Sequence, residues 1–204
     1  MSRRATARLF VAADPPATVR ERLAGWARAA AAGTSSDALP ALRLLDPENL
    51  HLTLCFLGSR PVEEIAAIGT ALSTCAADVG ELSVGAPLWL PPARPRSLAV
   101  AIHDEAGELA GLHAAVTGAI RESTDWEPER RRFRAHITVA RTRTRTRGRE
   151  PRGSGARAPA GAGLPATPQL RFNAESLTLY RSWLSPAGAR YEVLAMCGLS
   201  PTLR

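Results

Sequence analysis

Two copies of a His-x-Thr pattern are the residues of this chain whose types and spacing best suit acid–base chemistry. The pattern occurs as His51-x-Thr53 and again as His136-x-Thr138, each inside an apolar run. Because side chains alternate across a β-strand, the histidine and threonine of each copy share one face, and the opposite face is apolar. Two such strands facing each other would form a pocket with two proton-transfer groups and two hydroxyl donors. Such a pocket suits a phosphodiester.

Opening a cyclic phosphodiester with water needs a base that takes a proton from water and an acid that protonates the leaving ribose oxygen. His51 and His136 can fill these roles near neutral pH, and the residues alone leave open which is the acid. Thr53 and Thr138 would donate hydrogen bonds to the non-bridging oxygens, where charge builds in the transition state. The scheme requires neither a metal nor another cofactor.

Alternating strands and helices are expected to position the two motifs. Apolar runs predict strands over 8–13, 50–57, 81–90, 97–102, 135–141, 177–180 and 191–196, with a hairpin turn at 185–188. Helical spacing predicts helices from Asp14 to about Ala31, from Pro61 to about Cys75, and from about Glu105 to Arg121. Asp14 is expected to cap the first of these helices, ahead of two prolines.

The strand–helix–strand order occurs twice, which predicts duplication of a lobe. The two motif histidines are 85 residues apart, too far for a solenoid repeat. We therefore expect an α+β fold with two pseudo-symmetric lobes, each an antiparallel sheet backed by helices, and a central cleft. The whole chain, 1–204, is expected to form this single bilobal domain. Residues 142–168, rich in Arg, Gly and Pro, predict a flexible loop within it.

Charge and composition narrow the class of protein. The net charge is +7, but residues 142–167 hold six arginines against one glutamate, so the rest of the chain is only mildly basic. No apolar run approaches the length of a transmembrane helix, and the N-terminus is a poor signal peptide. The three cysteines show no CxxC spacing, which favours reduced, buried thiols. We expect a monomeric cytoplasmic protein that does not bind membranes.

The chain resembles the two-histidine (2H) phosphoesterase superfamily, and within it the bacterial LigT-like RNA 2′,3′-cyclic phosphodiesterases. The resemblance covers nearly the whole chain except the arginine-rich loop. It departs from the family pattern at Ala135, in place of a common proline, and at Leu44, in place of a common aromatic residue. The segments that carry it are Arg8-Leu9-Phe10-Val11-Ala12, Pro47-Glu48-Asn49-Leu50-His51-Leu52-Thr53-Leu54, Phe56-Leu57-Gly58, Arg94-Pro95-Arg96, Arg132-Phe133-Arg134-Ala135-His136-Ile137-Thr138-Val139-Ala140-Arg141 and Leu177-Thr178-Leu179-Tyr180-Arg181-Ser182.

This resemblance implies metal-independent hydrolysis of RNA or nucleotide 2′,3′-cyclic phosphates to a 2′-phosphate. It also implies 2′-5′ RNA ligation, in which a cyclic end is joined to a 5′-hydroxyl, as the reverse reaction. The expected partners are RNA ends or nucleotides with a 2′,3′-cyclic phosphate.

Two arginines are further candidates for phosphate binding, Arg141 and Arg96. Arg141 has the opposite parity to His136, so a regular strand would direct it away from the pocket. It would reach a phosphate only if the strand ends or bends there; otherwise a structural ion pair is expected.

Two alternative classes of protein remain open at this stage. One is a non-catalytic RNA- or nucleotide-binding module on the same fold. The other is a metal-dependent phosphodiesterase, although Asp46, Asp104 and Asp125 show no ligand spacing.

Several ring residues are expected to be structural. His103 and His113 are interpreted as residues at the boundary of the core. Phe10, Phe56 and Phe133 are expected in the core, where one near the cleft could stack on a base.

Overall fold

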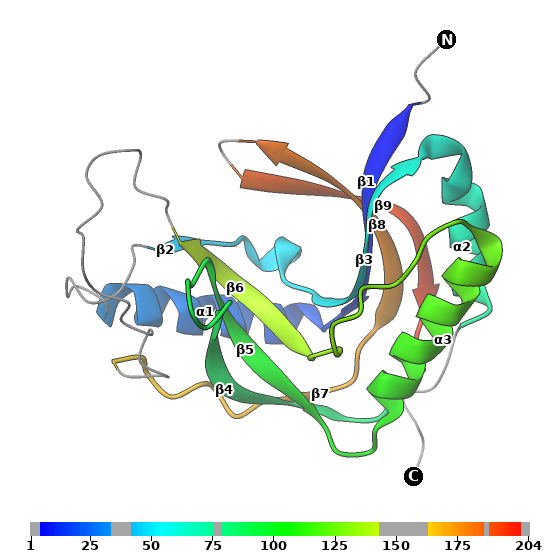
Figure 1. Cartoon of the computed structure of the whole chain (residues 1–204). Coiled ribbons are helices and arrows are strands. Elements are labelled where there is room, and N and C mark those ends of the chain that lie inside the picture. The colour runs from blue at the N-terminus through cyan, green and yellow to red at the C-terminus, as the bar shows by residue number, and fades with distance from the viewer. Residues whose placement is uncertain (1–4, 34–41, 76–78, 143–162, 186–187, 201–204) are drawn as a thin grey trace.

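The computed structural model describes residues 5–33, 42–75, 79–142, 163–185 and 188–200 of the 204-residue chain. Figure 1 shows how its strands and helices are arranged. In chain order the elements are β1 (Thr6–Asp14), α1 (Ala17–Gly33), β2 (Leu42–Leu44), the 3₁₀ helix η1 (Pro47–Asn49), β3 (Leu52–Pro61), the 3₁₀ helix η2 (Val62–Glu64), α2 (Ile65–Ser73), β4 (Leu82–Leu90), β5 (Ser97–Asp104), α3 (Glu108–Ser123), β6 (His136–Thr142), β7 (Arg171–Phe172), β8 (Ser176–Ser185) and β9 (Gly188–Gly198).

The strands form one curled sheet in which every described pairing is antiparallel. Its order is β7-β4-β5-β6-β3-β1-β8-β9, with β2 paired to β6. The predicted α+β class, with antiparallel strands backed by helices, is confirmed. The two expected lobes are the two halves of this sheet, β7-β4-β5-β6 and β3-β1-β8-β9.

A single bridge joins the two halves within the described residues. Leu52 of β3 pairs with Ile137 of β6, and these strands share no further pair there. Both side chains are buried almost completely, at 1% and 0% exposure. The joint is therefore held by apolar packing beneath it more than by a ladder of backbone hydrogen bonds.

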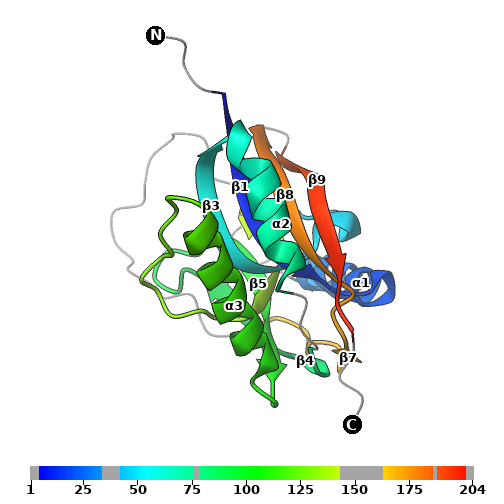
Figure 2. The same cartoon turned by 90° about the vertical axis from the view of Figure 1, so that its right-hand side faces the viewer.

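The helices do not simply back the half in which they arise. α2 and α3 lie side by side, α2 against β8 and β9 and α3 against β3 (Figure 2). α1 follows β1 in the chain but packs against β2 and β6 of the other half. None of the helices in the described ranges is both long and apolar enough to span a membrane.

Asp14 does not cap α1, so that prediction was wrong. Asp14 is the last residue of β1, and its carboxylate accepts hydrogen bonds from side chains of β8. The carbonyl of Pro16 begins the helix by accepting from the backbone N–H groups of Val19 and Arg20, at 3.0 and 3.1 Å. The hydroxyl groups of β8, distant in sequence, bind this carboxylate in place of the backbone N–H groups of the helix.

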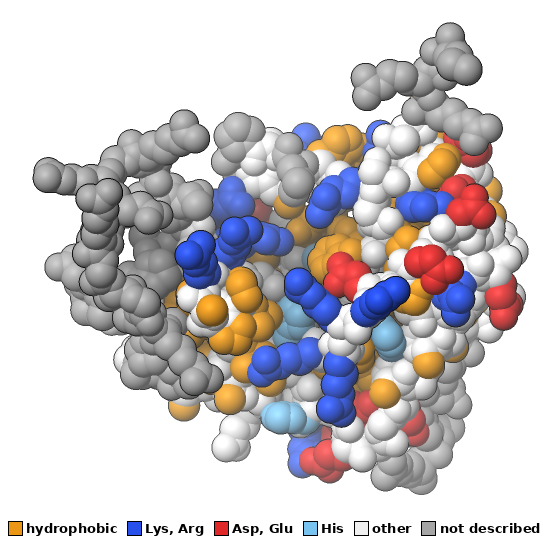
Figure 3. All heavy atoms as spheres, in the orientation of Figure 1, with side chains coloured by type: hydrophobic (Ala, Val, Ile, Leu, Met, Phe, Trp, Pro, Cys, Tyr) orange, Lys and Arg blue, Asp and Glu red, His pale blue; other side chains and the backbone are white. Residues whose placement is uncertain are grey.

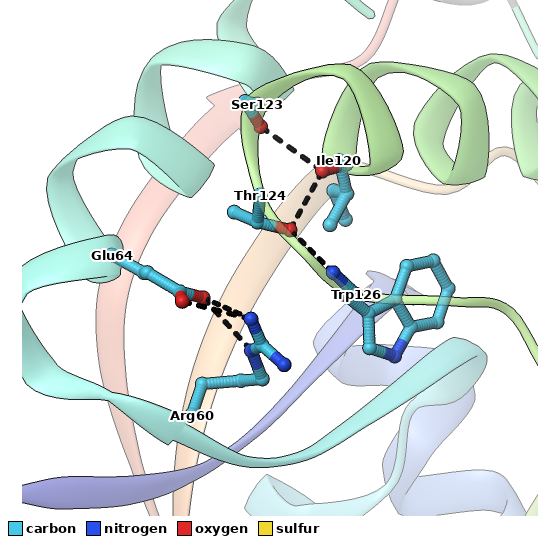
Figure 4. Close-up of polar contacts among 6 residues, drawn as sticks. All are labelled: Arg60, Glu64, Ile120, Ser123, Thr124 and Trp126. Carbon is cyan, nitrogen blue, oxygen red and sulfur yellow. Dashed lines mark hydrogen bonds and ion pairs between the residues drawn. The ribbon is translucent and has the colours of Figure 1, made fainter.

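Local side-chain bonds stabilise the segments that lead to and from the helices (Figure 4). At the end of α3, Thr124 Oγ1 donates to the carbonyl of Ile120 at 2.8 Å and accepts from the N–H of Trp126 at 3.2 Å. This turn brings the Trp126 side chain into the core. At the end of β3, Arg60 forms a two-bond ion pair with Glu64, at 2.8 Å for each bond.

The predicted flexible loop at 142–168 falls mainly on 143–162, outside the described residues. In the described part of the predicted loop, the carbonyl of Pro165 accepts a hydrogen bond from Trp26 Nε1 at 3.1 Å. That bond attaches the segment that leads into β7 to α1.

Replacing Ile137 by Ala tests the joint between the two halves. We expect the free energy of unfolding to fall by about 2–5 kcal/mol, since the change removes a fully buried side chain. Denaturant unfolding measures this. Val193, which is 54% exposed on β9, is the control, and V193A should change stability by no more than about 0.5 kcal/mol. A loss below about 1 kcal/mol for I137A would contradict the described packing.

Candidate active site

The Leu52–Ile137 bridge brings the two His-x-Thr motifs to one place. Its two side chains point into the core, so the residues on either side of each face the opposite surface of the sheet. In an antiparallel bridge, the histidine of one strand lies toward the threonine of the other. One cavity, of about 80 Å³, is lined by both motifs through His51, Thr53, His136 and Thr138. We call it the first cavity.

A β-bulge follows the threonine in each motif strand. In β3, Leu54 is the extra residue between the Thr53–Ala12 and Cys55–Val11 pairs. Such a bulge reverses which face the following side chains occupy. Phe56, expected in the core, is consequently 50% exposed and lines the first cavity, so that prediction was wrong.

The same bulge in β6 moves Arg141. Val139 is the extra residue between the Thr138–Ala99 and Ala140–Leu98 pairs. Arg141 therefore faces the first cavity in spite of its parity in a regular strand. The required bend is present, and it occupies the same place in both motifs.

Aromatic rings surround His51. Its ring centroid lies 4.8 Å from that of Phe10, 5.8 Å from that of Tyr180 and 5.2 Å from that of Tyr191, which meets it edge-on at 78°. Burial lowers the pKa of His51 from 6.5 to about 4, and the positive charge of Arg141 adds to this. The imidazole of His51 is therefore neutral at neutral pH.

Backbone carbonyls orient both motif histidines in the same way. The ring of His51 donates to the carbonyl of Asn49, two residues earlier, which by itself raises its pKa. Nδ1 of His136 lies 2.7 Å from the carbonyl of Arg134, also two residues earlier, and the carbonyl makes this nitrogen a donor. Each bond fixes the ring and leaves its other nitrogen for a ligand.

A buried carboxylate supports the aromatic layer from behind. Asp14 accepts hydrogen bonds from Ser176 at 3.0 Å, from Thr178 at 2.6 Å and from the hydroxyl of Tyr180 at 3.0 Å to each oxygen. Burial raises the pKa of Asp14, and these hydrogen bonds oppose that rise. Tyr180 in turn stacks on Phe10, with centroids 5.0 Å apart. The carboxylate thereby orients the ring that lies behind Phe10 and His51.

Cationic side chains gather on the face that contains the first cavity. Figure 3 shows them around apolar and histidine side chains, and all are arginine because the sequence contains no lysine. Arg8 and Arg141 line the cavity. The predicted phosphate ligand Arg96 is exposed but is not among the lining residues.

The other candidate residues lie elsewhere. His103 and His113 do not line the first cavity. His113 instead stacks on Phe133 at 4.3 Å, at the edge of the core. Among the described residues, no group of three or more His, Cys, Asp or Glu side chains is arranged to hold a metal ion.

Sequence reasoning missed several residues of the cavity wall, namely Arg8, Leu45, Asn49, Ser182 and Tyr191. Tyr191 and Ser182 come from the last two strands, and no local pattern marks them as neighbours of either motif. The available signal was that Arg8, Asn49 and Ser182 lie in segments that carry the family resemblance.

Comparison with solved structures places the fold. The crystal structure of TT0787 of Thermus thermophilus superposes with a TM-score of 0.71 at 24% identity, over 96% of this chain and 100% of that one. At this level of identity the match concerns the fold alone.

Comparison of sequences places the family. Residues 14–87 match the model of the LigT-like phosphoesterases. A protein of Archaeoglobus fulgidus named RNA 2′,3′-cyclic phosphodiesterase is 30% identical over 135 residues, which are 66% of this chain and 72% of that protein. One of the same name from Aeropyrum pernix is 31% identical over 101 residues, 49% of this chain and 57% of that protein. The chain belongs to the LigT-like phosphoesterase family.

The unusual state of His51 can be measured directly. In an NMR titration we expect its imidazole to have a pKa of about 4. Replacing Arg141 by Gln should raise this value, because a nearby positive charge disfavours the protonated ring. R171Q is the matched control, since Arg171 lies at the far edge of the sheet in an exposed pair with Glu81. A His51 pKa near 6.5 in the parent protein would contradict the described burial.

Proposed function

We propose that this protein hydrolyses 2′,3′-cyclic phosphates at RNA ends or on nucleotides, leaving a 2′-phosphate, with His51 and His136 as base and acid. The observation that carries the proposal is the convergence of both His-x-Thr motifs on the first cavity. The names of the two curated relatives support the choice of substrate.

The unlike surroundings of the histidines suggest their roles. His51 is neutral at neutral pH and already donates one ring N–H to a carbonyl, so its other nitrogen can accept a proton from water. The water oxygen attacks phosphorus, and the bond from phosphorus to the ribose 3′ oxygen breaks. His136 gives its proton to that oxygen. Attack by a 5′-hydroxyl in place of water would form a 2′-5′ linkage by the same step.

The remaining cavity residues suit the charge that develops. Thr53 and Thr138 would donate hydrogen bonds to the two non-bridging oxygens, one from each half of the sheet. Arg141 and Arg8 supply positive charge at the same cavity. Phe56, half exposed at the cavity, offers a face for stacking the base of the reacting nucleotide.

Replacing either motif histidine by Ala should lower kcat for a 2′,3′-cyclic nucleotide by about 10²–10⁴-fold, because each supplies one of the two proton transfers. Product analysis and initial rates measure the loss, and circular dichroism checks the fold. H103A, which alters an exposed histidine outside the cavity, should retain the parent rate.

Parent and histidine variants with equal rates would refute the assignment. A parent protein that binds the nucleotide without turnover would favour the non-catalytic binding module instead. Activity in excess EDTA should equal activity without it, and complete loss would favour a metal-dependent reaction.

The pH dependence of kcat/KM should reflect the neutral state of His51. On the acidic side we expect a decline with an apparent pKa of about 4, because protonation of His51 in the free enzyme removes the base. A rate profile on a mononucleotide 2′,3′-cyclic phosphate measures this. A decline in kcat/KM with an apparent pKa of about 6.5, the ordinary histidine value, would contradict this prediction.

A further inference from the structure

A second cavity adjoins the first and is not used by the mechanism above. Its volume is about 400 Å³, and it lies between η1 and the start of β9. Asn49 and Tyr191 line both cavities and form the wall between them. Molecules in the two cavities would therefore border the same two side chains.

The sizes of the two cavities fit different parts of a substrate. At about 80 Å³, the first has one fifth of the volume of the second, which suits a compact group such as a phosphate. The second is within the range of roughly 300–1,000 Å³ typical of ligand pockets. The larger space matches a nucleotide unit.

Arginines lie at both cavities. Arg141 lines the first and Arg190 the second. Arg43 pairs directly with Arg141 across β2 and β6, and its Nη1 atom lies 3.0 Å from where a Cβ would stand on Gly188, in the second cavity's wall. Like charges placed opposite each other in a sheet are unfavourable on their own. Within the described ranges none of the three forms an ion pair, so an anion bound by Arg43 would lessen its repulsion with Arg141.

Acidic side chains on the opposite wall limit what the anion can be. Asp46 and Glu48 line the second cavity and are exposed to it. A polyphosphate would be repelled by these carboxylates. A nucleotide unit combines one phosphate with ribose hydroxyl and base amino groups. These groups can donate hydrogen bonds to the carboxylates.

We propose that the second cavity binds the nucleotide that precedes the cyclic end of an RNA strand, with Arg43 and Arg190 on the phosphate that joins the two nucleotides. This proposal rests on the proposed function. It makes the enzyme selective for RNA ends over free cyclic mononucleotides, because only an RNA end occupies both cavities.

The test compares a dinucleotide ending in a 2′,3′-cyclic phosphate with the corresponding cyclic mononucleotide. The parent protein should show a kcat/KM about tenfold or more higher for the dinucleotide, and R190A should lower this ratio by about tenfold, the effect of one charge-assisted contact. R43A should lower it in the same direction. R171A, at the other edge of the sheet, should leave the ratio unchanged.

The outcomes separate this proposal from the proposed function. If the parent hydrolyses both substrates with equal kcat/KM, or R190A affects both equally, the function stands and the second-cavity proposal fails. If neither substrate is hydrolysed, the proposed function fails. In that case, calorimetric binding of a dinucleotide 3′-phosphate about tenfold tighter than a nucleoside 3′-monophosphate would support the second site, and equal affinities would overturn it.

Discussion

The packing of one residue pair, Leu52 on Ile137, is the constraint on which the rest of the structure depends. Across the described ranges it is the only strand pairing between two otherwise complete half-sheets. Because both side chains are apolar and point inward, their neighbours in each strand are forced to the other surface, where they meet. Burial of carbon atoms on one side of the sheet thus determines where polar groups converge on the other. Stability and the geometry of the cavity arise from the same contact.

The two motif strands are alike, but what surrounds them is not. His51 is enclosed by Phe10, Tyr180 and Tyr191, and the layer is held by the carboxylate of Asp14. This environment disfavours a charged imidazole and lowers its pKa. The residues packed around His51 therefore determine its charge state. Under the proposed mechanism, the residues packed behind His51 would make it the proton acceptor.

Features that depend on neighbouring residues could be predicted from the sequence, and features that depend on contacts between distant segments could not. Alternation of apolar and polar residues is local, so the motif strands and the shared face of His51 with Thr53 could be inferred from the sequence. The bulges at Leu54 and Val139 depend on the register of a partner strand, and no residue type in the sequence predicts them. The role of Asp14 depends on hydroxyls more than 160 residues away. The short strands β2 and β7 were missed because two or three residues carry no periodicity.

The matched bulges have a consequence for the direction of the reaction. Up to the threonine, each motif presents the same groups, so the motifs alone offer a cyclic phosphate two equivalent orientations. Three residues past each threonine the equivalence ends, since one strand contributes the ring of Phe56 and the other the cation of Arg141. A bound cyclic phosphate has a base on one side and charged oxygens on the other. It can place the base on Phe56 and the oxygens near Arg141 in only one orientation. Regioselectivity would then be decided by two side chains that the regular strand pattern assigns to the wrong surface.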